Sequence, residues 1–275
     1  MQSASPTVIA ASMPSLRPYR PRHFDDLGRF GAPHDGGYVV PRSALAACRT
    51  LLSLGVEADW SFEQAMLDMV PDLKVICVDG TTGPNVIESR YRRELRKAAL
   101  HLRPYKFMDA LKLRGKAAEF ETFFARHTFL KLMVSPTDAD GHTSLHRLLN
   151  RPDVREPIFL KMDIEGSEYE VLRSAATDLA RFVVIAIEFH DLGTRWPEFE
   201  QAMALLQRSH HIAHLHGNNY HRPIPGTNVP RTLEATFVQH ALCRGTPPAS
   251  ARSYPLPCLD SPNKRRRADL PLHFD

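Results

Sequence analysis

Short, uninterrupted apolar runs alternate along the middle of this chain with segments of helical periodicity. Seven runs have the length of a buried strand, and most end at or near a glycine or an acidic residue: 50–54, 74–78, 129–134, 158–162, 182–187, 212–215 and 235–238. Strands that are apolar on both faces are typical of a parallel sheet covered by helices on each side. Helical patterns fall between most of these runs, at 62–70, 86–102, 145–149, 168–176 and 199–209. The sequence therefore predicts an α/β fold, with a doubly wound, mostly parallel, seven-stranded Rossmann-like sheet.

The last two predicted strands differ from the others because no helix joins them. A loop rich in Pro, Gly and Asn connects them over residues 217–231. Parallel strands need a long crossover, whereas antiparallel strands do not. We therefore expect an antiparallel C-terminal hairpin at the end of the sheet.

The composition is that of one globular domain with irregular ends. Of 275 residues, 43% are hydrophobic and 24% are charged, which is enough apolar material for a core. We expect a flexible N-terminal arm at 1–22, a domain at 23–243 with a helical insertion at about 85–127, and a C-terminal tail at 244–275 that packs on or near the domain. No run approaches the roughly twenty apolar residues of a membrane span. No C-x-x-C pair occurs, and Cys77 lies in an apolar run, which favours a reducing, cytoplasmic location.

Basic residues gather in two places, although the net charge is only +4. One is the insertion, where five basic side chains occur between residues 90 and 97, and the other is the run Lys264–Arg267. Either group can be a solvated surface. The insertion can instead be a lid that contacts an anionic or sugar acceptor. A third interpretation is a non-catalytic nucleic-acid-binding module, against which the small net charge argues.

Glycine and acidic residues at two strand ends indicate an adenosine-bearing ligand. Gly55 ends one predicted strand and Asp79 ends the next. A glycine turn lets backbone approach a ligand closely, and an acid about twenty residues later accepts hydrogen bonds from ribose hydroxyls. NAD and S-adenosylmethionine (SAM) share this arrangement, so these two positions alone do not separate them.

The charge of the glycine turn separates the two cofactors. A dinucleotide places its pyrophosphate at the helix N-terminus and calls for several glycines without nearby acids. The turn here has Gly55 alone, together with Glu57 and Asp59. Two carboxylates would repel a pyrophosphate but suit a ligand that carries an ammonium and a sulfonium. Asp59 has a second interpretation as the N-cap of the following helix.

Several segments resemble the FkbM-type SAM-dependent methyltransferases. Residues 160–168 read LKMDIEGSE and are followed by Val171 and Leu172, and residues 143–149 fit the helix that this family places before that strand. Residues 34–41 read HDGGYVVP and resemble a subgroup whose N-terminal part carries a D-G-G-Y-V motif, as do 53–56 and 61–63. The likeness covers roughly residues 28 to 240. The chain departs from the common methyltransferase pattern by having one glycine in the turn and Ser53 where an acid is usual.

The resemblance implies a class I methyltransferase with SAM as cofactor. Position by position, it implies that Gly55 and Glu57 lie by the methionine part of SAM, with Asp59 in the same turn, and that Asp79 holds the ribose. Thr137 and Asp138 would lie near the adenine, and Asp163 beneath the sulfonium and the acceptor. Asp35–Tyr38 is either part of the pocket wall or a turn that starts a strand.

Three candidate catalytic residues lie at strand ends: His190, Asp163 and Glu188. His190 is the preferred general base because its ordinary pKa is near neutrality, although a histidine at a strand end can also be bonded to a backbone group. Asp163, Glu188 and His216 could instead hold Mg²⁺ or another divalent ion, which is possible but not expected. Lys161 lies in an apolar strand, so we expect it to pair with Glu165 or Glu188.

The sequence thus predicts transfer of a methyl group from SAM to a small molecule. The family likeness implies O-methylation of a hydroxyl such as that of a sugar or glycoside. The competing hypothesis is an NAD(P)-binding sugar oxidoreductase.

A capping box at Ser167 and Glu170 marks the start of the helix that follows Asp163. It places Asp163 and Glu165 at the carboxyl end of a strand, where open α/β sheets bind ligands.

Overall fold

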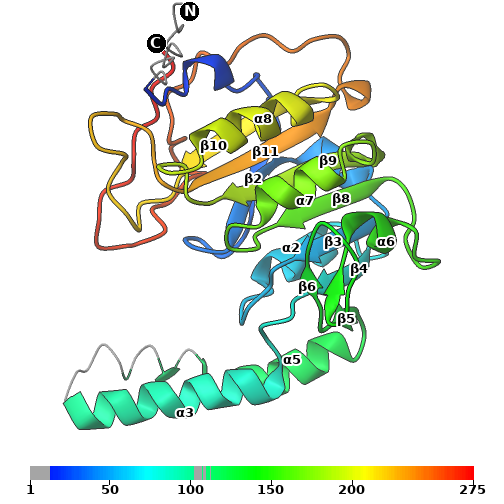
Figure 1. Ribbon diagram of the computed structural model, residues 1–275, viewed down its shortest axis with the longest axis vertical. Helices are drawn as coiled ribbons and strands as arrows, with labels where there is room; N and C mark the ends of the chain where they lie inside the picture. Colours follow the sequence, from blue (N-terminus) through cyan, green and yellow to red (C-terminus); the bar gives the residue numbers. More distant parts are fainter. Residues whose placement is uncertain (1–12, 102–106, 108–109, 112) are drawn as a thin grey trace, which may run out of the picture.

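The computed structural model describes residues 13–101, 107, 110–111 and 113–275 (Figure 1). Its centre is a seven-stranded sheet in the order β10-β11-β9-β8-β3-β4-β5. The strands are β3 (Thr50–Leu54), β4 (Lys74–Val78), β5 (Thr128–Leu130), β8 (Ile158–Met162), β9 (Phe182–Phe189), β10 (His210–Gly217) and β11 (Leu233–Gln239). Neighbours pair in parallel except β11, which is antiparallel to both β9 and β10. The predicted fold class and the C-terminal hairpin are therefore confirmed.

One predicted strand divides in two. The apolar run 129–134 becomes β5 and a separate two-residue strand, β6 (Met133–Val134), which pairs with β7 (His142–Thr143) outside the main sheet. The chain turns sharply between them, because the Leu132 N–H donates to the Leu130 carbonyl at 2.9 Å. Such a tight turn cannot continue a strand.

Helices cover both faces of the sheet because the strand side chains alternate between two apolar layers. On β3, Leu52 and Leu54 belong to one buried cluster and Leu51 to the other. The first cluster is completed by α6 (Leu145–Leu149), α7 (Glu168–Ser174) and α8 (Trp196–Leu206). The second contains α1 (Arg42–Ala46), α2 (Ser61–Met69) and the hairpin of β1 (Leu27–Gly31) and β2 (Gly37–Pro41). This is the doubly wound arrangement.

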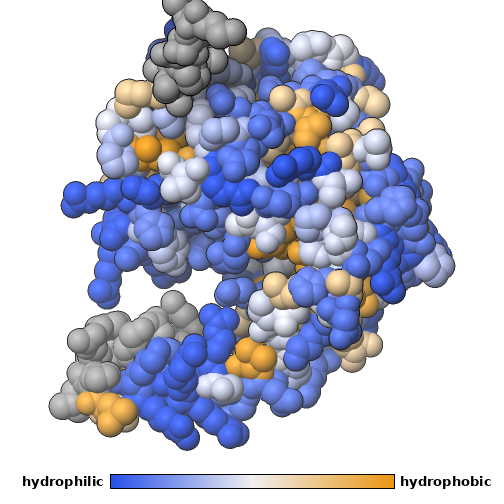
Figure 2. All heavy atoms as spheres, in the orientation of Figure 1, coloured by the Kyte–Doolittle hydropathy of each residue, from blue (hydrophilic) through white to orange (hydrophobic). Residues whose placement is uncertain are grey.

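A helical arm extends from the sheet end that carries β4 and β5 (Figure 1). It contains α3 (Pro84–His101) and α5 (Lys116–Phe124), which pack on each other. Trp60, just before α2, stacks on Phe123 with ring centroids 6.1 Å apart and meets Phe120 edge-on. The arm corresponds to the predicted insertion, and polar side chains dominate the surface that Figure 2 shows on it.

The two ends of the described chain lie along the same side of the molecule (Figure 1). Near the N-terminus, Tyr19 is buried against Trp196 and Phe199 of α8, so residues 13–22 of the predicted arm pack on the domain. Residues 1–12 lie outside the described residues. The C-terminal tail packs as well, with Tyr254, Leu256, Leu272 and Phe274 buried. Within the described part of the chain, no helix has both the length and the apolar character that spanning a membrane requires.

Candidate active site

A cavity of about 440 Å³ lies at the carboxyl ends of β3, β4, β8 and β9. The connection from β3 to β4 runs one way along the sheet, whereas β8 lies on the other side of β3. Open α/β sheets bind ligands at such a switch point. The cavity is also within the usual size range of small-molecule sites. It is therefore the candidate active site, and we call it the switch-point pocket.

Gly55 allows β3 and β8 to end against each other at the base of this pocket. Its φ is +77°, and a Cβ built on it would lie 1.6 Å from the Asp163 carbonyl oxygen. The Asp163 N–H in turn donates to the Leu54 carbonyl at 2.9 Å. A side chain at position 55 would separate these two strand ends. The position therefore requires glycine for steric reasons as well as for its positive φ.

Carboxylates dominate the pocket wall. Seven acidic residues line it: Asp35, Glu57, Asp59, Asp79, Asp163, Glu165 and Glu188. The basic or imidazole side chains in the wall are Lys161, His190 and His221. A site with this charge balance favours a cationic ligand over one that carries a diphosphate.

Asp79 organises the glycine turn from the end of β4. One carboxylate oxygen accepts the N–H groups of Val56 (3.0 Å) and Glu57 (2.8 Å), and the other accepts three hydrogen bonds from Thr81 and Thr82. Burial raises the pKa of Asp79, but these hydrogen bonds outweigh burial and hold the pKa below its ordinary value. Asp79 is thus an ionised wall residue whose oxygens already have protein partners. Its contact with a ribose stays a prediction.

The two acids of the turn have different partners. Asp59 accepts the Ser61 N–H at 2.9 Å and lines the pocket, but the N-cap residue of α2 is Trp60, so the interpretation of Asp59 as the N-cap is wrong. Glu57 has a φ of +48°, and its carboxylate lies 3.5 Å from the Arg90 guanidinium of α3. The helical arm formed by α3 and α5 therefore contacts the edge of the switch-point pocket through this pair of side chains.

Thr137 and Asp138 are not part of the pocket wall in this structure. Both are exposed, and Asp138 accepts the Ser144 N–H at 2.8 Å before α6. Leu132, Met133 and Val134 take their place in the wall, because the turn after β5 brings β6 to this edge. The expectation that Thr137 and Asp138 lie near the adenine is therefore not supported by their positions.

His190, just after β9, lies among carboxylates. Its Nδ1–H donates to Glu168 Oε1 at 2.9 Å, while Nε2 lies 3.9 Å from Asp163 Oδ1 and 3.6 Å from Glu165 Oε2. Burial lowers the pKa of His190, but the hydrogen bond to Glu168 and the charges of Glu188 and Asp163 outweigh it and raise the pKa to about 9. At neutral pH the ring is an imidazolium, which cannot serve as a general base in that state.

Glu188 and Lys161 occupy the buried floor of the pocket. The Asn218 amide donates to Glu188 at 2.7 Å, and burial together with Asp163 and Glu234 raises the pKa of Glu188 well above its ordinary value. Lys161 donates to the Gly55 carbonyl. The expectation that Lys161 forms an ion pair with Glu165 or Glu188 is wrong. Within the described residues, the Lys161 side chain is directed to the end of β3 instead.

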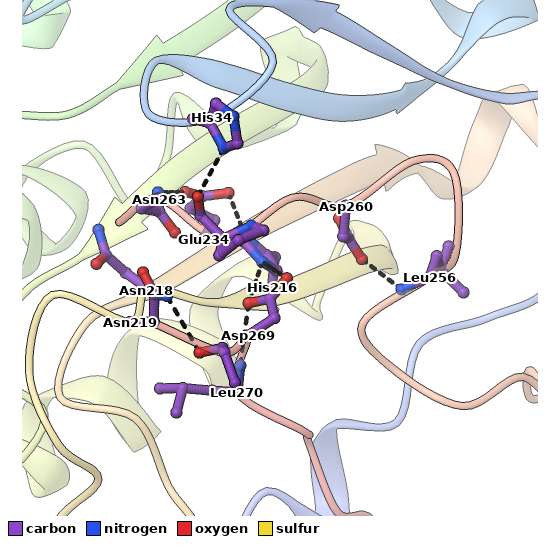
Figure 3. Close-up of polar contacts among 12 residues, drawn as sticks. His34, His216, Asn218, Asn219, Glu234, Leu256, Asp260, Asn263, Asp269 and Leu270 are labelled. Carbon is purple, nitrogen blue, oxygen red and sulfur yellow. Dashed lines mark hydrogen bonds and ion pairs between the residues drawn. The ribbon is translucent and has the colours of Figure 1, made fainter. Parts of the chain in front are cut away.

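The three residues named from the sequence as candidate ligands for a possible but not expected metal ion do not come together. His216 is buried outside the pocket wall, where it lies 3.0 Å from Glu234 and 3.0 Å from Asp269 (Figure 3). Successive side chains of a strand point to opposite faces of the sheet, and the His216 side chain is not among those that line the pocket. The set Asp163, Glu188 and His216 is therefore replaced by a different group, Asp163, Glu165 and His190, whose ligand atoms all lie within 4.8 Å of one another.

Two further groups near the pocket had no signal in the sequence patterns. Asn263 of the tail donates to Glu234 at 2.6 Å (Figure 3). Its side chain also lies 3.4 Å from Asp35 in the wall. Tyr220 and His221 of the 217–231 loop also line the pocket. Asp35 and Gly36 of the D-G-G-Y-V segment also line the pocket, and Tyr38 is buried in β2.

At α7, Ser167 is the N-cap residue, but its side chain makes no capping hydrogen bond, and Glu170 instead pairs with Arg195.

A family model described as "Methyltransferase FkbM domain" matches residues 138–217. This range contains Asp163, Glu188 and His190. The chain therefore carries a methyltransferase domain. A methyltransferase of this kind uses SAM as its methyl donor. The D-G-G-Y-V segment and the Gly55 turn lie outside the matched range, so the subgroup likeness remains a prediction.

Comparison with solved structures returns proteins of low sequence and structural similarity. Fibrillarin of Methanococcus jannaschii, described as a pre-rRNA processing protein, is 10% identical over 71% of this chain and 68% of its own, with a TM-score of 0.39. The N-methyltransferase NodS of Bradyrhizobium japonicum is 11% identical over 72% and 92%, with a TM-score of 0.34. The rRNA methyltransferase aviRa of Streptomyces viridochromogenes is 12% identical over 73% and 82%, with a TM-score of 0.32. No curated protein matches the sequence.

Proposed function

We propose that this methyltransferase transfers the SAM methyl group to a hydroxyl of a small molecule such as a sugar or glycoside. The observation that carries the proposal is the charge of the switch-point pocket, whose wall holds seven carboxylates. SAM carries an ammonium and a sulfonium, so the wall complements the donor. It opposes the pyrophosphate of NAD(P), the cofactor of the competing oxidoreductase hypothesis.

The cofactor is proposed to lie along the ends of β3 and β4. Gly55, Glu57 and Asp59 would face its methionine part, and Asp79 its ribose. Thr137 and Asp138 were expected beside the adenine, but Leu132 and Met133 are the residues that line this side of the pocket. Their apolar side chains suit the flat face of a purine, so we assign the adenine side to them. SAM supplies the methyl group, and the protein positions donor and acceptor in line.

The acceptor hydroxyl has to lose a proton, and the proposed catalytic residues Asp163, His190 and Glu188 surround that position. His190 is protonated at neutral pH and can donate a hydrogen bond. The Asp163 carboxylate, 3.9 Å from its Nε2, is the better candidate for accepting the proton. Glu188, which accepts the Asn218 amide at 2.7 Å, has carboxylate oxygens that can also accept a hydrogen bond from a second hydroxyl.

Titration calorimetry tests the donor. We expect binding of SAM and of S-adenosylhomocysteine (SAH) and no measurable binding of NAD⁺. Asp163→Asn should weaken SAM binding more than SAH binding, by several-fold, because SAH lacks the sulfonium charge. Asp140→Asn, at an exposed acid outside the pocket, is the control. Tighter binding of NAD⁺ than of SAH would overturn the proposal.

The acceptor class needs a separate assay. Release of SAH is measured while sugars, glycosides and, for comparison, primary amines are offered with SAM. We expect turnover with one or more hydroxyl acceptors, and loss of that turnover in His190→Ala with unchanged SAH affinity. Methylation of amines alone would contradict an O-methyltransferase. Nucleic-acid binding that falls steeply with salt would instead favour the binding-module hypothesis.

A further inference from the structure

We propose that Asp163, Glu165 and His190 form a binding site for one divalent first-row transition-metal ion at the acceptor side of the switch-point pocket. The three residues come from the ends of β8 and β9, and each offers one ligand atom within 4.8 Å of the others. Two carboxylate oxygens and one imidazole nitrogen are donors that such ions accept readily, whereas Mg²⁺ prefers oxygen alone.

The distances within this group are long for hydrogen bonds and suitable for a shared ion. His190 Nε2 lies 3.9 Å from Asp163 Oδ1 and 3.6 Å from Glu165 Oε2. Neither contact is a hydrogen bond. Two donors about 2.1 Å from one ion are separated by about 3.0 Å when they are at right angles and about 4.2 Å when they are opposite. Both observed separations fall between these limits.

The orientation of the His190 ring is an independent observation that points to a metal. Glu168 is fully buried, and its Oε1 accepts the Nδ1–H of His190 at 2.9 Å. This hydrogen bond directs Nε2 to Asp163 and Glu165, where a bound ion would replace the Nε2 proton that the metal-free ring carries at neutral pH. Histidines that bind metals characteristically donate their other ring N–H to a carboxylate in this way, because it fixes the tautomer and the ring plane.

The same carboxylate also holds the loop that carries Glu165. Glu168 Oε1 accepts the N–H groups of Gly166 at 3.0 Å and Ile164 at 3.3 Å, on either side of Glu165. Its second oxygen, Oε2, is buried without a hydrogen-bond partner. One buried group therefore positions two of the three proposed ligands, and its unpaired oxygen adds negative charge beside them.

The local charge favours an additional cation. Asp163, Glu165, Glu168 and Glu188 all contribute negative charge at His190 or its neighbours. Lys161 is the nearby ammonium, and it is engaged with the Gly55 carbonyl. Only three protein ligands contact the proposed ion, so positions remain for water or an acceptor. A hydroxyl bound there would lose its proton more easily; this use of the ion rests on the proposed function, whereas its binding does not.

Manganese binding tests the site without an acceptor. Protein freed of metal with a chelator and then dialysed is titrated with Mn²⁺, and the free ion is followed by electron paramagnetic resonance. We expect one Mn²⁺ per chain, with at least tenfold weaker binding in Glu165→Gln and in His190→Gln. Glu165 has a side chain 76% exposed, so Glu165→Gln has little reason to disturb folding. Asp140→Asn is the control and should bind Mn²⁺ like the parent protein.

Glu168→Gln tests the positioning role. It keeps the size of the side chain but weakens the acceptor for the Nδ1–H, so Mn²⁺ affinity should fall by 10- to 100-fold, as in other metal sites whose supporting carboxylate is changed. Calorimetry with SAH on the same samples separates the two proposals. SAH binding without Mn²⁺ binding would overturn the metal site alone, and Mn²⁺ binding without SAH or SAM binding would overturn the cofactor alone. Mn²⁺ binding that Glu165→Gln and His190→Gln leave unchanged would also overturn the site.

Discussion

The protonation of His190 is linked to folding because carboxylates surround the ring only in the folded chain. Its pKa rises from 6.5 to about 9, so the folded state holds the proton more tightly than the unfolded state. This contribution to stability is complete below about pH 6.5 and is lost as the pH rises through 9.

We therefore expect His190→Gln to lower the free energy of unfolding more at pH 6 than at pH 9.5, by a difference on the order of 2 kcal/mol. Denaturant titrations of the parent protein and the variant at both pH values, in the presence of a chelator, measure this. Equal effects of the substitution at the two pH values would show that the carboxylates do not hold the proton.

Asp79 has a structural and a proposed cofactor role, and two substitutions distinguish them. Asp79→Ala leaves the N–H groups of Val56 and Glu57 without their acceptor. We expect a loss of about 1–3 kcal/mol in unfolding free energy and a similar loss in SAH affinity. Thr81→Val removes one hydroxyl donor but keeps the carboxylate. It should change SAH affinity little. A folded Asp79→Ala protein with unchanged SAH affinity would contradict the ribose assignment.

At the scale of elements, the joint between β3 and β8 depends on a glycine. Gly55→Ala would place a methyl group against the Asp163 carbonyl, and the strand ends would have to separate. Gly141 has a similar φ of +70°, but a Cβ built there meets nothing within 4 Å. Gly141→Ala should therefore lower the free energy of unfolding only by the cost of a positive φ at an alanine, about 1–2 kcal/mol. Gly55→Ala should lower the free energy of unfolding, measured by denaturant titration, by at least twice as much. Equal costs would show that the joint tolerates a side chain.

The strands and helices were predictable because each is a local pattern. Apolar runs that end at Gly55, Asp79 and Asp163 gave the sheet and placed the pocket at its carboxyl edge. The prediction of one strand over residues 129–134 was wrong at the turn, because a hydrogen bond between Leu132 and Leu130 cannot be recognised from hydrophobicity. Thr137 and Asp138 follow that turn in the chain and lie outside the pocket wall.

The partners of charged side chains were less predictable than the elements. Lys161 could be recognised as a buried cation, but whether it faces Glu188 or the end of β3 depends on side-chain packing. Glu168 is the last residue of the LKMDIEGSE motif, but the motif does not predict its contact with His190, and Asn263 gave no sequence signal at all. Glu168 lies only 22 positions from His190, whereas Asn263 reaches Asp35 across 228. Contacts across such separations follow from the fold and not from spacing.

At the scale of the whole molecule, the C-terminal tail closes the sheet edge beside the pocket. Asp269 lies 3.0 Å from His216 on β10, and Asp260 lies 3.1 Å from His214 on the same strand (Figure 3 shows both acids). Burial lowers the pKa of His216, but Glu234 and Asp269 outweigh it and raise the pKa well above its ordinary value. The tail is thus held by buried contacts between carboxylates and histidines, and the charged pair at His216 is costly to break from one side.

The basic run 264–267 reports on this docking because trypsin cleaves after lysine and arginine. Its side chains are exposed, but Asn219 bonds the backbone of Lys264, Arg267 and Ala268, so the run is held in a turn. Proteases cleave such a segment mainly when it opens. Asp269→Ala should therefore speed cleavage in the run at least tenfold, which corresponds to about 1.4 kcal/mol of easier opening. Asp275→Ala is the matched control, since that acid is 95% exposed and pairs with Arg20 at the surface. Equal cleavage rates in the two variants would mean that the buried pair with His216 does not hold the tail.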